Sequence, residues 1–81
     1  GASAMAYHRY ADLLDGDEAL TYHRKAVELA PLEAQLYVSL GRALRLKGEK
    51  EEAERVLKLA QELDPDNPYL ESDILRLLED D

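Results

Sequence analysis

Apolar residues recur at steps of three and four along almost the whole chain, which is the spacing that places side chains on one face of an α-helix. Glycine or proline interrupts this pattern near residue 16, at residue 31, at residue 48 and at residue 65. The segments between the breaks predict five helices, over residues 4–14, 17–30, 32–47, 50–63 and 68–79. No segment alternates with a period of two over the length of a strand, so the predicted fold class is all-α.

The residues at the breaks predict how individual helices begin and end. Gly48 is expected to end a helix in the left-handed conformation, and Asn67, which precedes a proline, is expected to cap the start of the last helix. Asp15 and Glu18 have the form of a capping box. Gly41 lies inside a predicted helix, where glycine costs about 1 kcal/mol relative to alanine. We therefore expect the backbone of another helix to approach closely at Gly41.

The chain repeats itself with a period of 34 residues. Within residues 18–31, six of the fourteen positions are identical to the residue 34 positions later: Glu18, Ala19, Ala26, Glu28, Leu29 and Pro31. A period of this length is typical of stacked pairs of helices, in which each pair is one structural unit. The alternative is a plain helical bundle that carries a partial repeat by coincidence.

Small and large residues at fixed positions of the second unit resemble the tetratricopeptide repeat family. The matching residues are Tyr37, Leu40, Gly41, Leu44, Gly48, Ala53, Leu57, Ala60 and Pro65. The resemblance implies a right-handed α-solenoid of helical hairpins in a single domain. This expected domain contains an irregular first repeat over residues 1–33, a second repeat over residues 34–67 and a C-terminal capping helix over residues 68–81. The first helix departs from the family pattern at Ala6, Tyr7 and Leu14, where leucine, a small residue and the turn glycine are usual.

Charge and composition exclude several classes of function. Ten Lys and Arg residues against eighteen Asp and Glu residues give a formal net charge of −8, which repels nucleic-acid phosphates and anionic lipid surfaces. We therefore expect no nucleic-acid and no membrane partner. The chain has no cysteine, no signal-peptide pattern and no apolar run long enough to span a membrane. These features favour the cytoplasm as its location.

No motif in the chain predicts an enzyme, a metal site or a cofactor. Four acidic residues between positions 12 and 18 lack the alternation and the distal glutamate of a calcium loop. His8 and His23 lie on different predicted helices without metal-ligand spacing, which favours a packing or surface role. The hydroxyl residues Ser3, Thr21 and Ser39 are not surrounded by a nucleophile motif, and glycine-rich phosphate loops are missing.

The predicted binding surface is the face of residues 32–47 opposite the buried stripe of Leu36, Leu40 and Leu44. Stacked helix pairs expose a concave surface lined by the first helix of each pair. Arginines on this face predict a small basic strip, with Val38, Leu46 and Tyr69 as apolar anchors for an extended or helical peptide. The residues predicted to contact a protein or peptide partner are His8, Gln35, Val38, Arg42, Arg45, Leu46, Tyr69 and Arg76.

The resemblance also limits which partner to expect. Some members of the family bind the C-terminal carboxylate of chaperones with lysines and asparagines on the first helices. The matching positions here hold Ala4, His8, Ser39, Tyr69 and Asp73, so that role is not expected.

A second interpretation belongs to another class of function, namely a self-associating structural unit. In this interpretation Tyr7, Tyr10 and Tyr22, at the irregular N-terminal end, are buried against a second copy of the chain in a homodimer.

Overall fold

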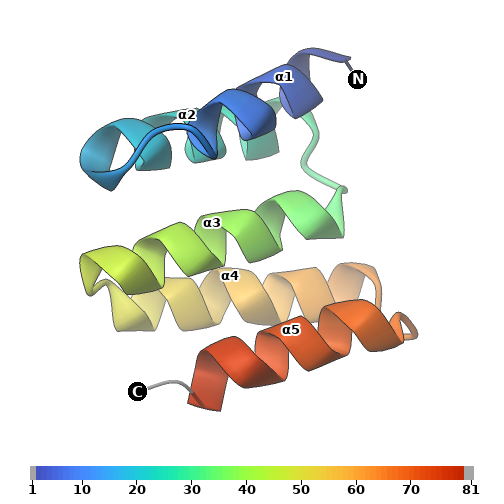
Figure 1. Ribbon diagram of the computed structural model, residues 1–81. Helices are drawn as coiled ribbons and strands as arrows, with labels where there is room; N and C mark the ends of the chain where they lie inside the picture. The colour runs from blue at the N-terminus through green and yellow to red at the C-terminus, as the bar shows by residue number, and fades with distance from the viewer. Residues whose placement is uncertain (1, 80–81) are drawn as a thin grey trace.

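A computed structural model describes residues 2–79, without the side chains of Ala2 and Tyr69. Over this range the chain forms five α-helices and no strands, as the periodicity predicts (Figure 1). The helices are α1 (Ala2–Ala11), α2 (Gly16–Leu29), α3 (Ala34–Lys47), α4 (Lys50–Leu63) and α5 (Pro68–Glu79). Their bounds match the predicted ranges to within one residue, except that α1 begins two residues and ends three residues earlier than expected and α3 begins two residues later.

The helices are arranged as two stacked hairpins followed by a single helix. In Figure 1, α1, α3 and α5 lie toward the viewer, whereas α2 and α4 lie behind them. The start of α2 at Gly16 and the start of α4 at Lys50 are 34 residues apart, and the same interval separates the starts of α3 at Ala34 and α5 at Pro68. The repeat in the sequence is therefore also a repeat in space, and the predicted helical-hairpin solenoid is confirmed.

The core consists of three clusters, each of which joins three consecutive helices. Such clusters bury the apolar face that one hairpin alone would leave exposed, which is why repeats of this kind stabilise one another. The clusters comprise Ala4, Ala26 and Leu36 from α1 to α3, Leu20, Leu40, Leu44 and Ala53 from α2 to α4, and Val38, Leu57, Ala60, Leu70 and Ile74 from α3 to α5.

The contact between α3 and α4 explains the glycine inside α3. A Cβ atom at Gly41 would lie 2.7 Å from both Cγ and Cδ2 of Leu57 and 3.3 Å from Cγ2 of Val56. Helix α4 does approach closely at Gly41, but the nearest atoms are side-chain atoms of α4 and not the helix backbone that was expected.

In the first hairpin, aromatic rings form the contact between α1 and α2, where the second hairpin has the contact of Gly41 with Leu57. Tyr7, which lies 34 residues before Gly41, stacks on Tyr22 with ring centroids 5.8 Å apart, and Tyr10 meets Tyr22 edge to face at 4.9 Å. Each such pair contributes roughly 0.5–1.5 kcal/mol beyond its buried area. A bulky residue at position 7 is therefore compatible with the fold because its partner on α2 is also aromatic.

The turn between α1 and α2 differs from the turn between α3 and α4. Gly48 ends α3 with φ of +93°, as predicted. The equivalent residue 34 positions earlier is Leu14, for which a left-handed conformation would be strained. Accordingly α1 ends at Ala11, four residues connect it to α2, and Gly16 takes the positive φ, at +62°.

The helix caps agree only in part with the prediction. The Leu70 N–H donates a hydrogen bond to Asn67 Oδ1 at 3.2 Å, which confirms the predicted cap of α5. Asp15 occupies the N-cap position of α2, but its side chain makes no capping hydrogen bond, so the predicted capping box is wrong. The longer turn holds Asp15 extended, and its side chain stays exposed to solvent.

Candidate functional site

A hollow of about 460 Å³ lies where α1, α3 and α5 face the same side of the molecule. We call it the groove. The turn that leads into α3 and the connection from α4 to α5 complete its walls. Its lining residues are His8, Asp12, Glu33, Ala34, Gln35, Val38, Ser39, Arg42, Asp64, Asn67, Leu70 and Asp73.

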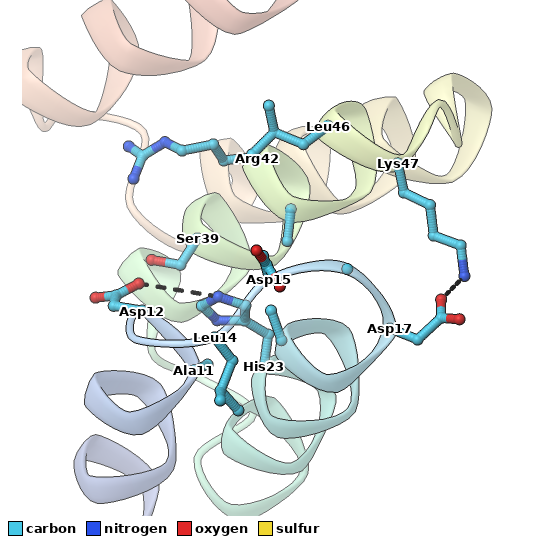
Figure 2. Close-up of a pocket in the computed structure, with 13 residues that line it drawn as sticks. Ala11, Asp12, Leu14, Asp15, Asp17, His23, Ser39, Arg42, Leu46 and Lys47 are labelled. Carbon is cyan, nitrogen blue, oxygen red and sulfur yellow. Dashed lines mark hydrogen bonds and ion pairs between the residues drawn. The ribbon is translucent and has the colours of Figure 1, made fainter.

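A second hollow of about 660 Å³ adjoins the groove, and we call it the notch. It lies between the α1–α2 turn and the C-terminal half of α3. Figure 2 shows Leu14 and His23 on one side of the notch and Arg42 and Leu46 across from them on α3. Since α1 ends at Ala11, no further helical turn covers the end of α3 here, and Leu46 is 85 % exposed.

Two histidines and one aspartate line the boundary between the groove and the notch. The rings of His8 and His23 have centroids 5.8 Å apart. Asp12 lies 3.8 Å from Nε2 of His8 and 3.9 Å from Nε2 of His23. Neither imidazole Nδ1 makes a hydrogen bond to the described part of the chain, although both atoms are buried.

Burial determines the protonation of His23. The residue lies 34 positions before the core residue Leu57 and is only 5 % exposed. Desolvation lowers the pKa of His23 below its ordinary value, and Asp12 opposes this shift, whereas the charges of His8 and Arg42 add to it. His23 is therefore neutral at neutral pH and acts as a core residue that borders the notch.

The structure brings only part of the predicted binding surface together. His8, Gln35, Val38 and Arg42 line the groove, and Leu46 lines the notch. Arg45 and Arg76 line neither hollow, so the predicted basic strip does not form there. The side chain of Tyr69 lies outside the described part of the structure.

The prediction made for Val38 is wrong. The residue was expected to be an exposed apolar anchor, but it is 3 % exposed and belongs to the core cluster that contains Leu57 and Ile74. Because α5 packs against α3 on this side, the face opposite the stripe of Leu36, Leu40 and Leu44 is covered at Val38.

Carboxylates supply most of the charge of the groove, and no pattern in the sequence predicted this. Asp12, Glu33, Asp64 and Asp73 contribute four carboxylates, whereas Arg42 is the one lysine or arginine among the described lining residues. These carboxylates come from four separate segments, so no local run of acidic residues marks them. The 34-residue repeat could have placed one of them. Asp73 lies 34 residues after Ser39, so it occupies on α5 the position that Ser39, a residue of the groove, occupies on α3.

The groove and the notch contain no arrangement typical of catalysis or metal binding. Between residues 2 and 79, no group of three or more His, Cys, Asp or Glu residues is placed to hold a metal ion. Ser39 lines both hollows, and among the described residues its side chain makes no hydrogen bond to either histidine ring. The polar lining is suited to hydrogen bonds and ion pairs with a ligand.

Comparison with protein families identifies the repeat. The tetratricopeptide repeat family matches residues 6–72, and the chain therefore belongs to this family. Members of the family generally mediate protein–protein interactions and are typically not enzymes. No curated protein and no solved structure matches the chain. None of the described helices is both long enough and apolar enough to cross a lipid bilayer.

Proposed function

We propose that the groove binds a peptide segment of a partner protein, in extended or helical form. The observation that carries this proposal is the hollow itself, which extends over α1, α3 and α5, the helices that line the inner face of the solenoid. Its lining is mostly polar, so hydrogen bonds and ion pairs to a bound segment account for specificity.

Arg42 is the residue of the groove best placed to contact a ligand directly. Its exposed side chain lines both hollows, and it makes no hydrogen bond or ion pair with another described residue. Gln35 and His8 offer further polar contacts, and the exposed Leu46 offers an apolar contact for a side chain in the notch. In this proposal Arg45 and Arg76 have no direct role, because they line neither hollow.

Peptides selected from a displayed random library test the proposal. Binding of the selected peptides is compared between the wild type, the groove variants Arg42→Ala and Gln35→Trp, and the control Lys58→Ala on the exposed side of α4. We expect each groove variant to weaken binding about tenfold and the control to leave it unchanged. Peptides that bind both groove variants as tightly as the wild type would contradict the proposal.

A second candidate function is self-association through the α1–α2 end. Tyr10, whose ring packs edge to face against Tyr22, is 49 % exposed, and Leu13 in the α1–α2 turn is 81 % exposed. Burial of these side chains against a second copy would remove apolar surface from water. Light scattering over a range of concentrations tests this candidate, and a strict monomer at the highest concentration rules it out.

A further inference from the structure

We infer that the segment bound in the groove carries lysine or arginine side chains, so that the groove selects a cationic peptide. The inference rests on the proposed function, since it names the chemistry of the partner that the same groove binds. The arginines of α3 led us to expect a basic binding surface, whereas the residues that line the groove are mainly acidic.

The carboxylates of the groove surround the path that a bound segment would take. Asp12 follows α1, Glu33 precedes α3, Asp64 follows α4, and Asp73 lies one turn into α5. A ligand that extends from α1 across α3 to α5 therefore meets a carboxylate at each helix. Arg42 provides one positive charge against these four.

Two of the four carboxylates are available for a ligand. Neither Glu33 nor Asp73 makes a side-chain hydrogen bond or an ion pair with another described residue. Asp64 already accepts a hydrogen bond from Asn67 Nδ2 at 3.1 Å, and Asp12 faces the two histidines. Asp73 is partly buried, so solvent screens its charge less than that of a fully exposed carboxylate.

The charge of the whole molecule acts in the same direction. With a formal charge of −8, the protein attracts a cationic segment at long range and repels an acidic one. The groove also has a limited apolar surface, because its buried apolar residues Val38 and Leu70 are 3 % and 8 % exposed. A purely apolar segment would therefore find little apolar surface to contact in the groove.

A metal ion is not the cation that this lining fits. No group of three or more His, Cys, Asp or Glu residues in the described range is close enough to share one ion. Separate carboxylates of this kind suit several cationic side chains spaced along a peptide.

Three synthetic peptide pools of equal length test the inference, namely one rich in Lys and Arg, one rich in Asp and Glu, and one uncharged. Binding is followed through the amide NMR signals of the groove residues at about 25 mM and about 300 mM NaCl. We expect the cationic pool to shift these signals, with weaker binding at the higher salt concentration.

Paired variants with equal net charge separate a local effect from a general one. Glu33→Gln with Asp73→Asn removes two groove carboxylates, and the control Glu28→Gln with Glu62→Gln removes two carboxylates that line neither hollow. We expect the groove pair to weaken cationic-peptide binding about tenfold and the control pair to change it less than twofold. The single variant Glu33→Gln, which should weaken binding by a smaller factor, serves if the groove pair unfolds.

The outcomes distinguish the two proposals. Tighter groove binding by the acidic or the uncharged pool overturns the cationic inference but supports a peptide-binding groove. Equal weakening by the groove pair and the control pair also overturns the inference, because net charge alone then accounts for the attraction. If no pool shifts the groove signals and library-selected peptides ignore the groove variants, the proposed function itself fails.

Discussion

Arg24 on α2 and Glu52 on α4 form a bidentate ion pair that joins the two repeats. Arg24 Nη1 donates to Glu52 Oε2 at 2.6 Å, and Nη2 donates to Oε1 at 3.1 Å. The hydrogen bonds raise the pKa of Arg24 and lower the pKa of Glu52. The pair lies on two helices of the outer layer, away from the groove, and it connects one unit to the next.

The first prediction concerns the strength of this pair. Arg24→Gln should lower the free energy of unfolding by less than about 1 kcal/mol, because the Arg24 side chain is 47 % exposed and water screens the charges. Urea denaturation at about 50 mM and about 1 M NaCl measures the effect, which should shrink at high salt. An equal loss at both salt concentrations would show that packing, and not charge, links the repeats at this point.

The second prediction concerns the contact at Gly41. Gly41→Ala should destabilise the protein by about 1–3 kcal/mol, because the added Cβ overlaps Leu57 and this outweighs the higher helix propensity of alanine. Chemical denaturation of the single variants and of Gly41→Ala combined with Leu57→Ala measures the coupling. The double variant should lose less stability than the sum of the two single losses, and strict additivity would contradict the contact.

The third prediction concerns Gly48, where the backbone alone decides the outcome. No atom lies within 4 Å of a Cβ built at Gly48, yet its φ is +93°. Gly48→Ala should therefore cost about 1 kcal/mol through backbone strain without any steric clash. A synthetic chain with D-alanine at this position is the matched control, and it should retain wild-type stability in thermal melting. A D-alanine chain that melts as early as the L-alanine variant would refute this explanation.

The fourth prediction concerns the pH dependence that His23 adds to stability. Its folded pKa is lowered, so the unfolded chain binds a proton more readily once the pH falls below the ordinary value of 6.5. Stability should thus be complete above this pH and decrease as the pH falls toward the folded pKa. Thermal melting at about pH 7.5 and about pH 5.5 should show a smaller loss for His23→Leu than for the wild type.

The same variant has a second expected effect at neutral pH. Leucine occupies the equivalent core position at residue 57, and the Nδ1 atom of His23 is buried without a hydrogen bond to the described residues. His23→Leu should therefore raise the unfolding free energy by about 1 kcal/mol. An equal acid-induced loss in both proteins would show that His23 does not cause the pH dependence.

Much of the fold was predictable because it depends on local patterns. The spacing of apolar residues located all five helices, and Gly48 and Asn67 have conformations that their own chemistry favours. The error at Asp15 has a different origin. Its capping box depends on the length of the α1–α2 turn, and that length follows from Leu14 standing where the other unit has glycine.

The predicted residues that line the groove lie on α3 and, in the case of His8, on α1. Gln35 and Arg42 share the face of α3 that the helical period identifies, and both line the groove. Val38 shares that face too, but α5 buries it, and helical periodicity contains no information about which neighbour covers a face.

By itself, the amino-acid sequence determined the helices, the 34-residue repeat and the family, because each depends on residue type at a fixed spacing. Only the tertiary structure decided the charge of the groove. Asp12, Glu33, Asp64 and Asp73 are separated by up to 61 positions in the chain, and stacking of α1, α3 and α5 brings them to one surface. The physical reason is that the electrostatic field of a surface sums over residues that are close in space, whatever their separation in sequence.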